Sequence, residues 1–349
     1  MNATTNYQNT RILLSSRPEG EPTAANFQIE TIDVPAPAEG EVLLRTIYLS
    51  LDPYMRGRMS AAKSYAAPVG IGDVMEGGTV SEVVESRHPD LMAGDFVLSH
   101  CGWQSYAVVP GGRHLRKLDP GSAPISTAVG VLGMPGFTAY AGLLAIGKPQ
   151  QGETVAVAAA TGPVGSMVGQ LAKIKGANAI GIAGGPDKVA FLRRLGFDEA
   201  LDHRSPGFLA QVKAATPDGI DVYFENVGGA VWDAVLPRLN TYARVPVCGL
   251  VAHYNDTQMP AGPDQLPKLM RNILTKSLTI RGFIQNEFIN DYYKAFQKDV
   301  AGWIADGRIQ YREDIVTGLE NTPEAFAGLL TGKNFGKLLI EVAPDSTRV

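Results

Sequence analysis

The chain has 349 residues, 45% of them hydrophobic and 19% charged, and its formal net charge at pH 7 is −4. These values indicate a globular protein of two domains and argue against nucleic acid or an anionic membrane as its main partner. The polar N-terminus, the lack of an apolar run of about 20 residues and the presence of only two cysteines, Cys101 and Cys248, predict a cytoplasmic location.

The first 130 residues predict a mostly β domain, in which runs such as 41–48 and 77–84 are separated by clusters of proline and glycine. From about residue 131 strands alternate with helices, which is typical of a doubly wound parallel sheet, the Rossmann fold. We therefore predict an α/β protein with a Rossmann domain at 131–311. The mostly β domain comprises 1–130 and 312–349, because the tail contains a further strand that is expected to rejoin it.

The expected elements of the Rossmann domain follow the chain in short segments. The alternating segments are 138–146, 154–159, 164–175, 178–183, 187–195, 199–201, 208–215, 220–225, 230–238 and 243–248. A last strand is expected at 278–283, an amphipathic helix at 291–306, and the tail strand at 335–342.

The stretch 153–165 contains the most informative motif of the chain. An apolar strand runs into a turn of small residues, which matches G-x-G-x-x-G with Ala160 in the first position and Gly162 and Gly165 in the others. Gly162 lets the backbone approach a pyrophosphate, Gly165 lets the next helix pack closely on the strand, and the helix N-terminus favours an anion. The motif predicts a dinucleotide site at Gly162, Pro163, Val164 and Gly165.

The residues after the second strand indicate NADPH rather than NADH. NAD sites usually hold the ribose 2′-hydroxyl with an acidic residue at this strand end, but here two glycines close the strand and Lys188 follows. A lysine beside the 2′-phosphate would favour NADPH by about 1–3 kcal/mol after desolvation, and His203 or Arg204 could add a second cationic contact. Two other interpretations remain open: Asp187 could cap the next helix beside a solvated Lys188, or it could be a displaced NAD acid.

Two further strand ends are placed to hold the nicotinamide, because ligands of such sheets bind at the carboxyl ends of the strands. One is Asn226, which follows the strand at 220–225. The other follows the strand at 243–248 and includes Cys248, Gly249, Leu250, Val251, Ala252, His253 and Tyr254. Each could be an ordinary turn, but their register with the phosphate-binding turn favours cofactor binding.

The residues that several common enzyme mechanisms require are missing from this chain. The cysteines lie far apart and no Cys-x-x-Cys or His-Glu pair occurs, so we predict no metal site. No tyrosine is followed by lysine four positions later, which argues against short-chain carbonyl reduction. No Gly-x-Ser-x-Gly motif for a serine hydrolase is present.

A nicotinamide enzyme without these groups can still reduce a polarised C=C bond. Hydride adds to the β-carbon of an enone and negative charge develops on the carbonyl oxygen, so the protein must aim a hydrogen-bond donor at that oxygen. A tyrosine hydroxyl is protonated at neutral pH and can donate. Tyr254 is the first candidate for this donor, and Tyr54 and Tyr65 could line the substrate wall from the first domain. Each tyrosine could instead pack between the domains.

Two other functions remain open at this point. A quinone oxidoreductase would use the same cofactor without a proton donor at Tyr254. An NADPH-sensing protein would bind the cofactor tightly and regulate a partner without catalysis.

Motifs along nearly the whole chain, from about residue 11 to 342, resemble those of one enzyme family. They occupy residues 49–59, 133–140, 159–165, 226–229, 248–249, 254–255 and 332–337. Their residues and order are similar to those of the zinc-independent branch of the medium-chain dehydrogenase/reductases, which contains prostaglandin reductases and plant alkenal double-bond reductases.

The resemblance implies a GroES-like catalytic domain, an NADP-binding Rossmann domain and NADPH-dependent reduction of the C=C bond of α,β-unsaturated ketones or aldehydes, with curcumin-like enones as expected substrates. It also implies cofactor contacts at Phe283, Ile284, Gln285 and Asn334, and a homodimer joined through the Rossmann sheets. The chain departs from the family at His203, where relatives often place a tyrosine on the 2′-phosphate. A protonated His203 or Arg204 would have to replace that contact.

Overall fold

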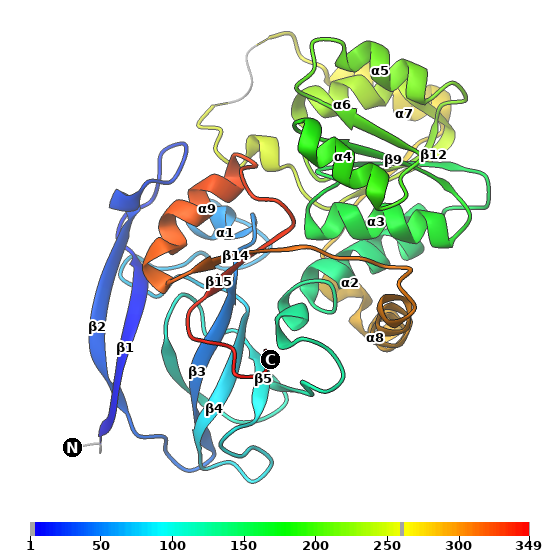
Figure 1. Cartoon of the computed structure of the whole chain (residues 1–349). Coiled ribbons are helices and arrows are strands. Elements are labelled where there is room, and N and C mark those ends of the chain that lie inside the picture. The colour runs from blue at the N-terminus through cyan, green and yellow to red at the C-terminus, as the bar shows by residue number, and fades with distance from the viewer. Residues whose placement is uncertain (1–3, 259–261, 349) are drawn as a thin grey trace. The chain divides into compact units, whose positions relative to one another are not determined.

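The computed structural model describes residues 4–258 and 262–348, which form two compact units (Figure 1). One unit comprises Met1–Gly130 with Glu313–Val349, and the other comprises Val131–Arg312. Each unit contains its own clusters of buried apolar side chains.

The first unit is mostly β. Its main sheet has seven strands, which are β3 (Glu41–Ser50), β4 (Thr79–Ser86), β5 (Phe96–Ser99), β6 (Tyr106–Pro110), β7 (Arg116–Leu118), β14 (Glu313–Thr317) and β15 (Lys337–Glu341). A separate hairpin is formed by β1 (Thr4–Leu14) and β2 (Phe27–Pro35), and the unit also contains α1 (Met55–Arg58) and α9 (Thr322–Leu330). The main path runs in the order β14-β15-β3-β4-β5-β7, and β6 also pairs with β3.

The end of the chain is fixed to the middle of the first unit. Strand β15 is antiparallel to β3, with Leu339 opposite Ser50, and Figure 1 shows the two strands side by side. At the start of β15 the buried Lys337 ammonium donates to the carbonyl oxygen of Leu51 over 2.7 Å and to the carboxylate of Asp52 over 2.8 Å. This buried ion pair fixes the segment that leads from β3 into α1.

The second unit contains a six-stranded parallel sheet. Its strands are β8 (Thr154–Ala158), β9 (Asn178–Ala183), β10 (Glu199–Asp202), β11 (Ile220–Phe224), β12 (Leu239–Val247) and β13 (Thr279–Gly282). They lie in the order β10-β9-β8-β11-β12-β13, and all neighbouring pairs are parallel. This is the strand order of the Rossmann fold, and it confirms the predicted fold class. The order reverses between β8 and β11, where ligands of such sheets bind.

Helices cover both faces of this sheet, as the alternation of side chains along β8 requires. Val155 and Val157 pack in one apolar cluster with α2 (Met134–Ala141), α3 (Pro163–Ile174) and α8 (Ile289–Ala305). Ala156 and Ala158 pack in another cluster with α5 (Phe208–Ala215), α6 (Gly229–Val235) and α7 (Leu266–Lys276). Successive side chains of a strand point to opposite faces, so a sheet buried on both faces has continuously apolar strands.

Some helices differ from the sequence expectation. The helix expected at 138–146 begins earlier, at Met134, and continues from α2 into a π-helical segment at Gly142–Gly147. Pro135 lies in its first turn, where the missing N–H of proline has no helical partner to lose. The sequence analysis did not predict α7 and α9, which both carry a proline in the first turn.

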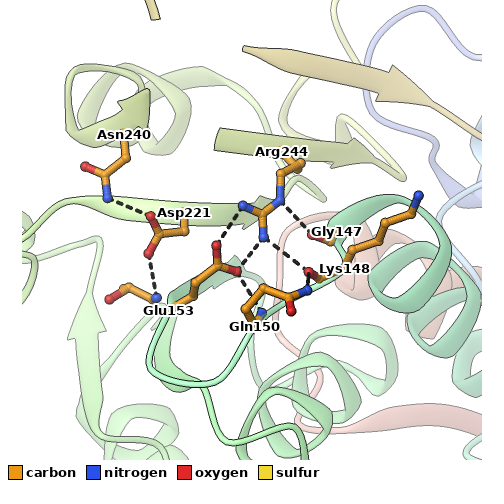
Figure 2. A network of polar contacts seen from close by, with 8 residues as sticks. Gly147, Lys148, Gln150, Glu153, Asp221, Asn240 and Arg244 are labelled. Carbon is orange, nitrogen blue, oxygen red and sulfur yellow. Dashed lines mark hydrogen bonds and ion pairs between the residues drawn. The ribbon is translucent and has the colours of Figure 1, made fainter. Parts of the chain in front are cut away.

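A polar network lies at the amino ends of β8 and β11, away from their carboxyl ends (Figure 2). The guanidinium of Arg244 donates to the two carboxylate oxygens of Glu153 over 2.9 and 2.5 Å, and to the carbonyl oxygen of Gly147 over 2.9 Å. Asp221 accepts a bond of 2.9 Å from the backbone N–H of Thr154. The network joins the end of the π-helical segment to three strands of the sheet.

Candidate cofactor-binding and active site

The turn between β8 and α3 has the geometry of a phosphate-binding turn. Ala159 has a φ of +50°, Gly162 caps α3, and the Gly162 N–H donates to the Ala159 carbonyl oxygen over 3.0 Å. A Cβ on Gly165 would lie 2.5 Å from that oxygen, so only glycine permits this packing of α3 on the turn. The sequence motif placed the first position at Ala160, but the left-handed residue that makes the turn is Ala159.

The carboxyl ends of β8 and β11 are joined by the side chain of Asn226. Its amide nitrogen donates to the carbonyl oxygen of Ala158 over 2.9 Å. Because β8 and β11 are the strands between which the sheet order reverses, this bond lies where the fold places a dinucleotide. Asn226 was predicted as a cofactor residue, and the structure puts it beside the end of the strand that leads into the phosphate-binding turn.

A buried carboxylate, which the sequence analysis did not single out, shapes the loop after β11. One oxygen of Glu225 accepts the N–H groups of Val227 and Gly228 over 2.7 and 2.9 Å and the hydroxyl of Tyr223 over 3.1 Å. Burial raises the pKa of Glu225, although the N–H groups of Val227 and Gly228 favour its charged form. An acidic residue that ends an apolar strand before two glycines was the only sequence signal for this role.

The loop after β12 is tied to the loop after β11 by backbone hydrogen bonds. The Cys248 N–H donates to the Glu225 carbonyl oxygen over 2.9 Å, and the Ala252 N–H donates to that of Val227 over 3.0 Å. A third bond of 3.2 Å joins the Val251 N–H to the Asn226 carbonyl oxygen. The two strand ends that the sequence assigned to the nicotinamide therefore form one structure.

Tyr254 follows the short helix Val251–His253 and folds back over its own loop. Its hydroxyl oxygen lies 3.4 Å from the N–H of Leu250, and a Cβ on Gly249 would approach it to 3.0 Å. The half-buried ring thus brings a phenol to the loop that is hydrogen-bonded to Asn226. This placement suits a hydrogen-bond donor at the carboxyl edge of the sheet.

The side chains of His253 and Cys248 belong to the same loop as Tyr254 but contact different groups. His253 Nδ1 lies 2.7 Å from a carboxylate oxygen of Asp256, and its ring lies over Gly228. Burial raises the pKa of the Cys248 thiol to about 12, with a further contribution from the Glu225 carboxylate. The thiol is therefore neutral at physiological pH, and this loop adds no thiolate to the site.

Basic side chains gather where the carboxyl ends of β9 and β10 meet. A Cβ on Gly184 would lie 2.7 Å from Arg204 Nε and 2.8 Å from His203 Nε2, so both side chains lie over this glycine. One carboxylate oxygen of Asp202 accepts the N–H groups of Gly185 and Arg204 over 2.9 Å each and fixes the two strand ends. The structure thus brings together His203 and Arg204, two of the basic residues for which the sequence predicts a phosphate contact.

The pKa of His203 indicates which of His203 and Arg204 can supply the second cationic contact. Burial lowers the pKa of His203, and Arg204 and Lys188 lower it further, although Asp202 acts in the opposite direction. His203 is therefore neutral at pH 7, and Arg204 is the residue that can replace the family's tyrosine with a charge. Asp187 lies in the first turn of α4 (Pro186–Arg194), whereas the residue at the cap position is Gly185.

The segment after β13 contributes mainly to the core. The ring of Phe283 is buried between Phe224 and Phe288, with centroid distances of 6.1 and 6.0 Å. Ile284 is exposed, and Gln285 begins a short helix in which it is bonded to the side chain of Asn286. In this segment the side chain of Phe283 is occupied by packing, and only its backbone remains for a cofactor.

Three of the predicted site residues belong to the first unit. Tyr54 and Tyr65 both contact the Arg58 guanidinium, whose carbon is 5.6 and 4.4 Å from their ring centroids. The side-chain nitrogen of Asn334 donates to the carbonyl oxygen of Gly336 over 2.9 Å, just before β15. The structure therefore brings the two tyrosines together and places Asn334 in a separate turn of the same unit.

Residues 4–258 and 262–348 contain no group of three His, Cys, Asp or Glu side chains that could hold a metal ion. The same stretches contain no helix of the length and apolar character that a membrane span requires. Cys101 is buried in the first unit, and it and Cys248 are both free thiols.

The glycine turn, the basic cluster and the loop with Tyr254 fit the parts of a phosphorylated dinucleotide, and similarity to known proteins points the same way. Residues 10–118 match a family model described as the N-terminal domain of oxidoreductase, and residues 163–300 match one described as zinc-binding dehydrogenase. The chain is 55% identical to the NADPH-dependent curcumin reductase of Escherichia coli (strain K12), over 97% of this chain and 98% of that protein.

More distant relatives and a solved structure extend this similarity. Prostaglandin reductase 1 of Oryctolagus cuniculus is 40% identical over 94% of this chain and 92% of its own length. The 2-alkenal reductase (NADP(+)-dependent) of Nicotiana tabacum is 38% identical over 97% of this chain and 98% of its own. The crystal structure of CurA in complex with NADPH from Vibrio vulnificus has a TM-score of 0.93 and 53% identity, covering 96% of this chain and 100% of that one.

Proposed function

Because this chain belongs to the zinc-independent medium-chain dehydrogenase/reductases, we propose that it reduces the C=C bond of α,β-unsaturated ketones and aldehydes with NADPH. The observation that carries the proposal is the position of Tyr254. Its loop is hydrogen-bonded to the loop that begins at Asn226, whose side chain reaches Ala158 at the reversal point of the sheet. Curcumin-like enones are the proposed substrates, because proteins named as reductases of curcumin and of alkenals are among the relatives.

The cofactor residues divide by the part of NADPH that they would hold. The proposed pyrophosphate site is the turn at Gly162, Pro163, Val164 and Gly165, where the first N–H groups of α3 have no partner within the helix. Lys188 and Arg204 are the proposed cationic partners of the 2′-phosphate, and neutral His203 can donate or accept a hydrogen bond there.

The proposed nicotinamide residues come from several strand ends. They are Asn226, the loop from Cys248 through Leu250, Val251, Ala252 and His253 to Tyr254, the backbone of Phe283, and Ile284, Gln285 and Asn334. When bound, NADPH supplies the hydride that adds to the β-carbon of the enone.

The chain's own residues then act on the substrate. Tyr254 donates a hydrogen bond to the carbonyl oxygen, where negative charge develops as the enolate forms, and one such donor typically contributes about 10²–10³ in rate. The α-carbon receives its proton from Tyr254 or from solvent. Tyr54 and Tyr65 hold the apolar body of the substrate.

The protein is also proposed to be a homodimer joined through its Rossmann sheets. Strand β13 ends the sheet order, so one of its edges can pair with a second copy. Leu266, Met270 and Leu274 of the nearby α7 are exposed, Leu274 by 80%. An apolar helix face beside an open strand edge is typical of an association surface.

Initial-rate measurements test the proposed reaction. The protein is incubated with NADPH or NADH and with a panel of enones, alkenals and quinones, while the absorbance of the reduced cofactor is followed. We expect turnover on enones with NADPH and much weaker activity with NADH. Activity on quinones alone would replace the proposed reaction with quinone reduction, and tight NADPH binding without turnover would indicate a cofactor-sensing protein.

A further inference from the structure

The charge of Arg58 in the first unit is neutralised before any substrate arrives. Its Nε lies 2.6 Å from a carboxylate oxygen of Glu76, and the side chain of Arg58 is only 6% exposed, against 42% for Glu76. A buried cation with a carboxylate this close is costly to separate from it, because the cation would be left without its counter-charge. Arg58 is therefore a poor partner for a second anion.

The same guanidinium joins the two tyrosines proposed to hold the substrate. It lies 4.4 Å from the ring centroid of Tyr65 and 5.6 Å from that of Tyr54, within the range of a cation–π contact. The backbone of Arg58 accepts the N–H of Val69 over 2.9 Å, which holds the end of the segment that carries Tyr65. Arg58 thus fixes both the rings and the loop between them.

Three further titratable groups near Tyr54 add no free charge. Asp52 forms its ion pair with Lys337. Burial lowers the pKa of His100 despite the opposing effect of Glu76 and Asp52, so this imidazole is neutral at pH 7. Burial raises the pKa of Tyr54, with contributions from Asp52 and Glu76, so its phenol is neutral too.

Arg56, the other arginine of α1, is engaged elsewhere. Its Nη2 donates to the carbonyl oxygen of Gly20 over 2.9 Å, and its side chain is buried. Both arginines of α1 are therefore already engaged by groups of the protein.

We propose that the Arg58–Glu76 pair makes the substrate wall formed by Tyr54 and Tyr65 selective for neutral aryl enones over enones that carry a carboxylate. The inference rests on the proposed function and names the substrate class within it. Glu76 cancels the charge that would attract an acidic substrate, and Arg58 is a positioning residue that contacts the rings of both Tyr54 and Tyr65. A carboxylate on the substrate would be repelled by the Glu76 carboxylate, and Arg58 offers it no free charge because that charge is already paired.

Two substrates that differ in charge at the para position test the proposal, and comparing their ratio between variants cancels their intrinsic difference in size and reactivity. One is benzylideneacetone with a para methyl ester, and the other carries a para carboxylate. For the wild-type enzyme with saturating NADPH, we expect kcat/KM to be at least about 10-fold higher for the ester. In Glu76→Gln the cation of Arg58 is no longer cancelled, so the ratio of ester to acid should fall about 10-fold, through KM rather than kcat.

Two further variants separate this role from a general structural effect. Arg58→Met removes the cation but leaves the Glu76 carboxylate, so the KM for the ester should rise about 10-fold and the ratio of ester to acid should not fall. Glu82→Gln breaks a matched ion pair of the same unit, in which Arg45 Nη2 lies 2.5 Å from Glu82. This control should leave both KM values and the ratio unchanged.

The outcomes distinguish this inference from the function on which it rests. If the wild type binds NADPH but reduces neither compound, the proposed function is wrong and the inference falls with it. If the wild type reduces the ester and Glu76→Gln, with unchanged NADPH affinity, keeps the wild-type ratio, only the selectivity role is overturned. Should Glu76→Gln fail to fold, two other results test the selectivity role. A wild-type ratio of ester to acid near one overturns it, and so does an Arg58→Met enzyme whose KM for the ester is unchanged.

Discussion

The side-chain amide of Asn226 donates a hydrogen bond of 2.9 Å to the carbonyl oxygen of Ala158, and this bond links the carboxyl ends of β8 and β11, the paired strands between which the sheet order reverses. Ala158 leads directly into the left-handed Ala159 and the turn proposed to bind the pyrophosphate. Through the backbone bonds of its loop, Asn226 is connected to the segment that carries Tyr254. The proposed phosphate and nicotinamide ends of the site are thus built on one hydrogen-bonded frame.

The close packing of α3 on this turn predicts that Gly165→Ala weakens cofactor binding. The added Cβ would lie 2.5 Å from the Ala159 carbonyl oxygen, so the helix must move away from the turn. Overpacking of this kind costs about 1–3 kcal/mol, and if this cost falls on the bound state NADPH affinity should fall about 5- to 150-fold. Calorimetric titration measures the dissociation constant of NADPH for the wild type and the variant. Gly302→Ala in α8 is the control, because its Cβ has open space, and equal loss of affinity in both variants would contradict the account.

The basic cluster predicts the cofactor preference. Lys188→Ala should weaken NADPH binding by roughly 10–100-fold and scarcely change NADH binding, because only NADPH carries the 2′-phosphate. Fluorescence titrations with the two cofactors give the ratio of dissociation constants. Lys213→Ala, at an exposed position near the end of α5, serves as the charge-matched control. A parallel loss of NADH affinity in Lys188→Ala would argue against a 2′-phosphate contact.

Tyr254→Phe should separate catalysis from binding. The variant keeps the ring over Gly249 but loses the hydroxyl proposed to face the substrate carbonyl. We expect kcat on an enone to fall about 10²-fold, while the dissociation constant of NADPH changes by less than about 3-fold. The exposed Tyr242 provides the control substitution Tyr242→Phe. Unchanged kcat in Tyr254→Phe would remove Tyr254 from the donor role.

The network around Arg244 predicts a pH-dependent stability. Although burial raises the pKa of Glu153, the hydrogen bonds from Arg244 and from the Gln150 N–H outweigh it and hold the pKa below its ordinary value of 4.5. A group whose pKa is lowered on folding contributes stability above its unfolded pKa and loses it as the pH falls through the lower folded value. The contribution of this network should therefore be complete at neutral pH and decline below about pH 4.5.

Thermal unfolding of Arg244→Met measures this contribution. We expect the variant to be less stable than the wild type by about 1–3 kcal/mol at pH 7, and the difference to shrink in acid. The affinity for NADPH should not change, because the network lies at the edge of the sheet opposite the carboxyl ends of β8 and β11 (Figure 2). A difference in stability that grows as the pH falls would contradict the assigned direction of the Glu153 shift.

Much of the second unit could be predicted from the sequence because its signals are local. The apolar strand, the small-residue turn and the glycine at Gly165 lie within one short stretch, and their spacing is dictated by strand and helix geometry. The basic residues Lys188 and His203 follow strand ends, and parallel strands bring such ends together. The protonation of His203 could not be predicted, since it depends on burial and on the charges packed around Gly184.

The features that sequence reasoning missed depend on contacts between distant residues or on ambiguous local patterns. Glu225 resembles an ordinary polar strand end until its carboxylate is seen to accept two backbone N–H groups of the next loop. Glu76 pairs with Arg58 across a segment that contains no regular periodicity. Helix α7 has a proline in its first turn and exposes several apolar side chains, so its pattern does not distinguish a buried face from a surface one.

The most direct test of the central claim follows the transferred hydride. The wild-type protein is incubated with benzylideneacetone and NADPH that carries deuterium at the transferable position, and the product is analysed by NMR and mass spectrometry. The account predicts a saturated ketone with one deuterium on the β-carbon. Deuterium on the carbonyl carbon of an allylic alcohol, or no transfer by protein fully loaded with NADPH, would contradict it.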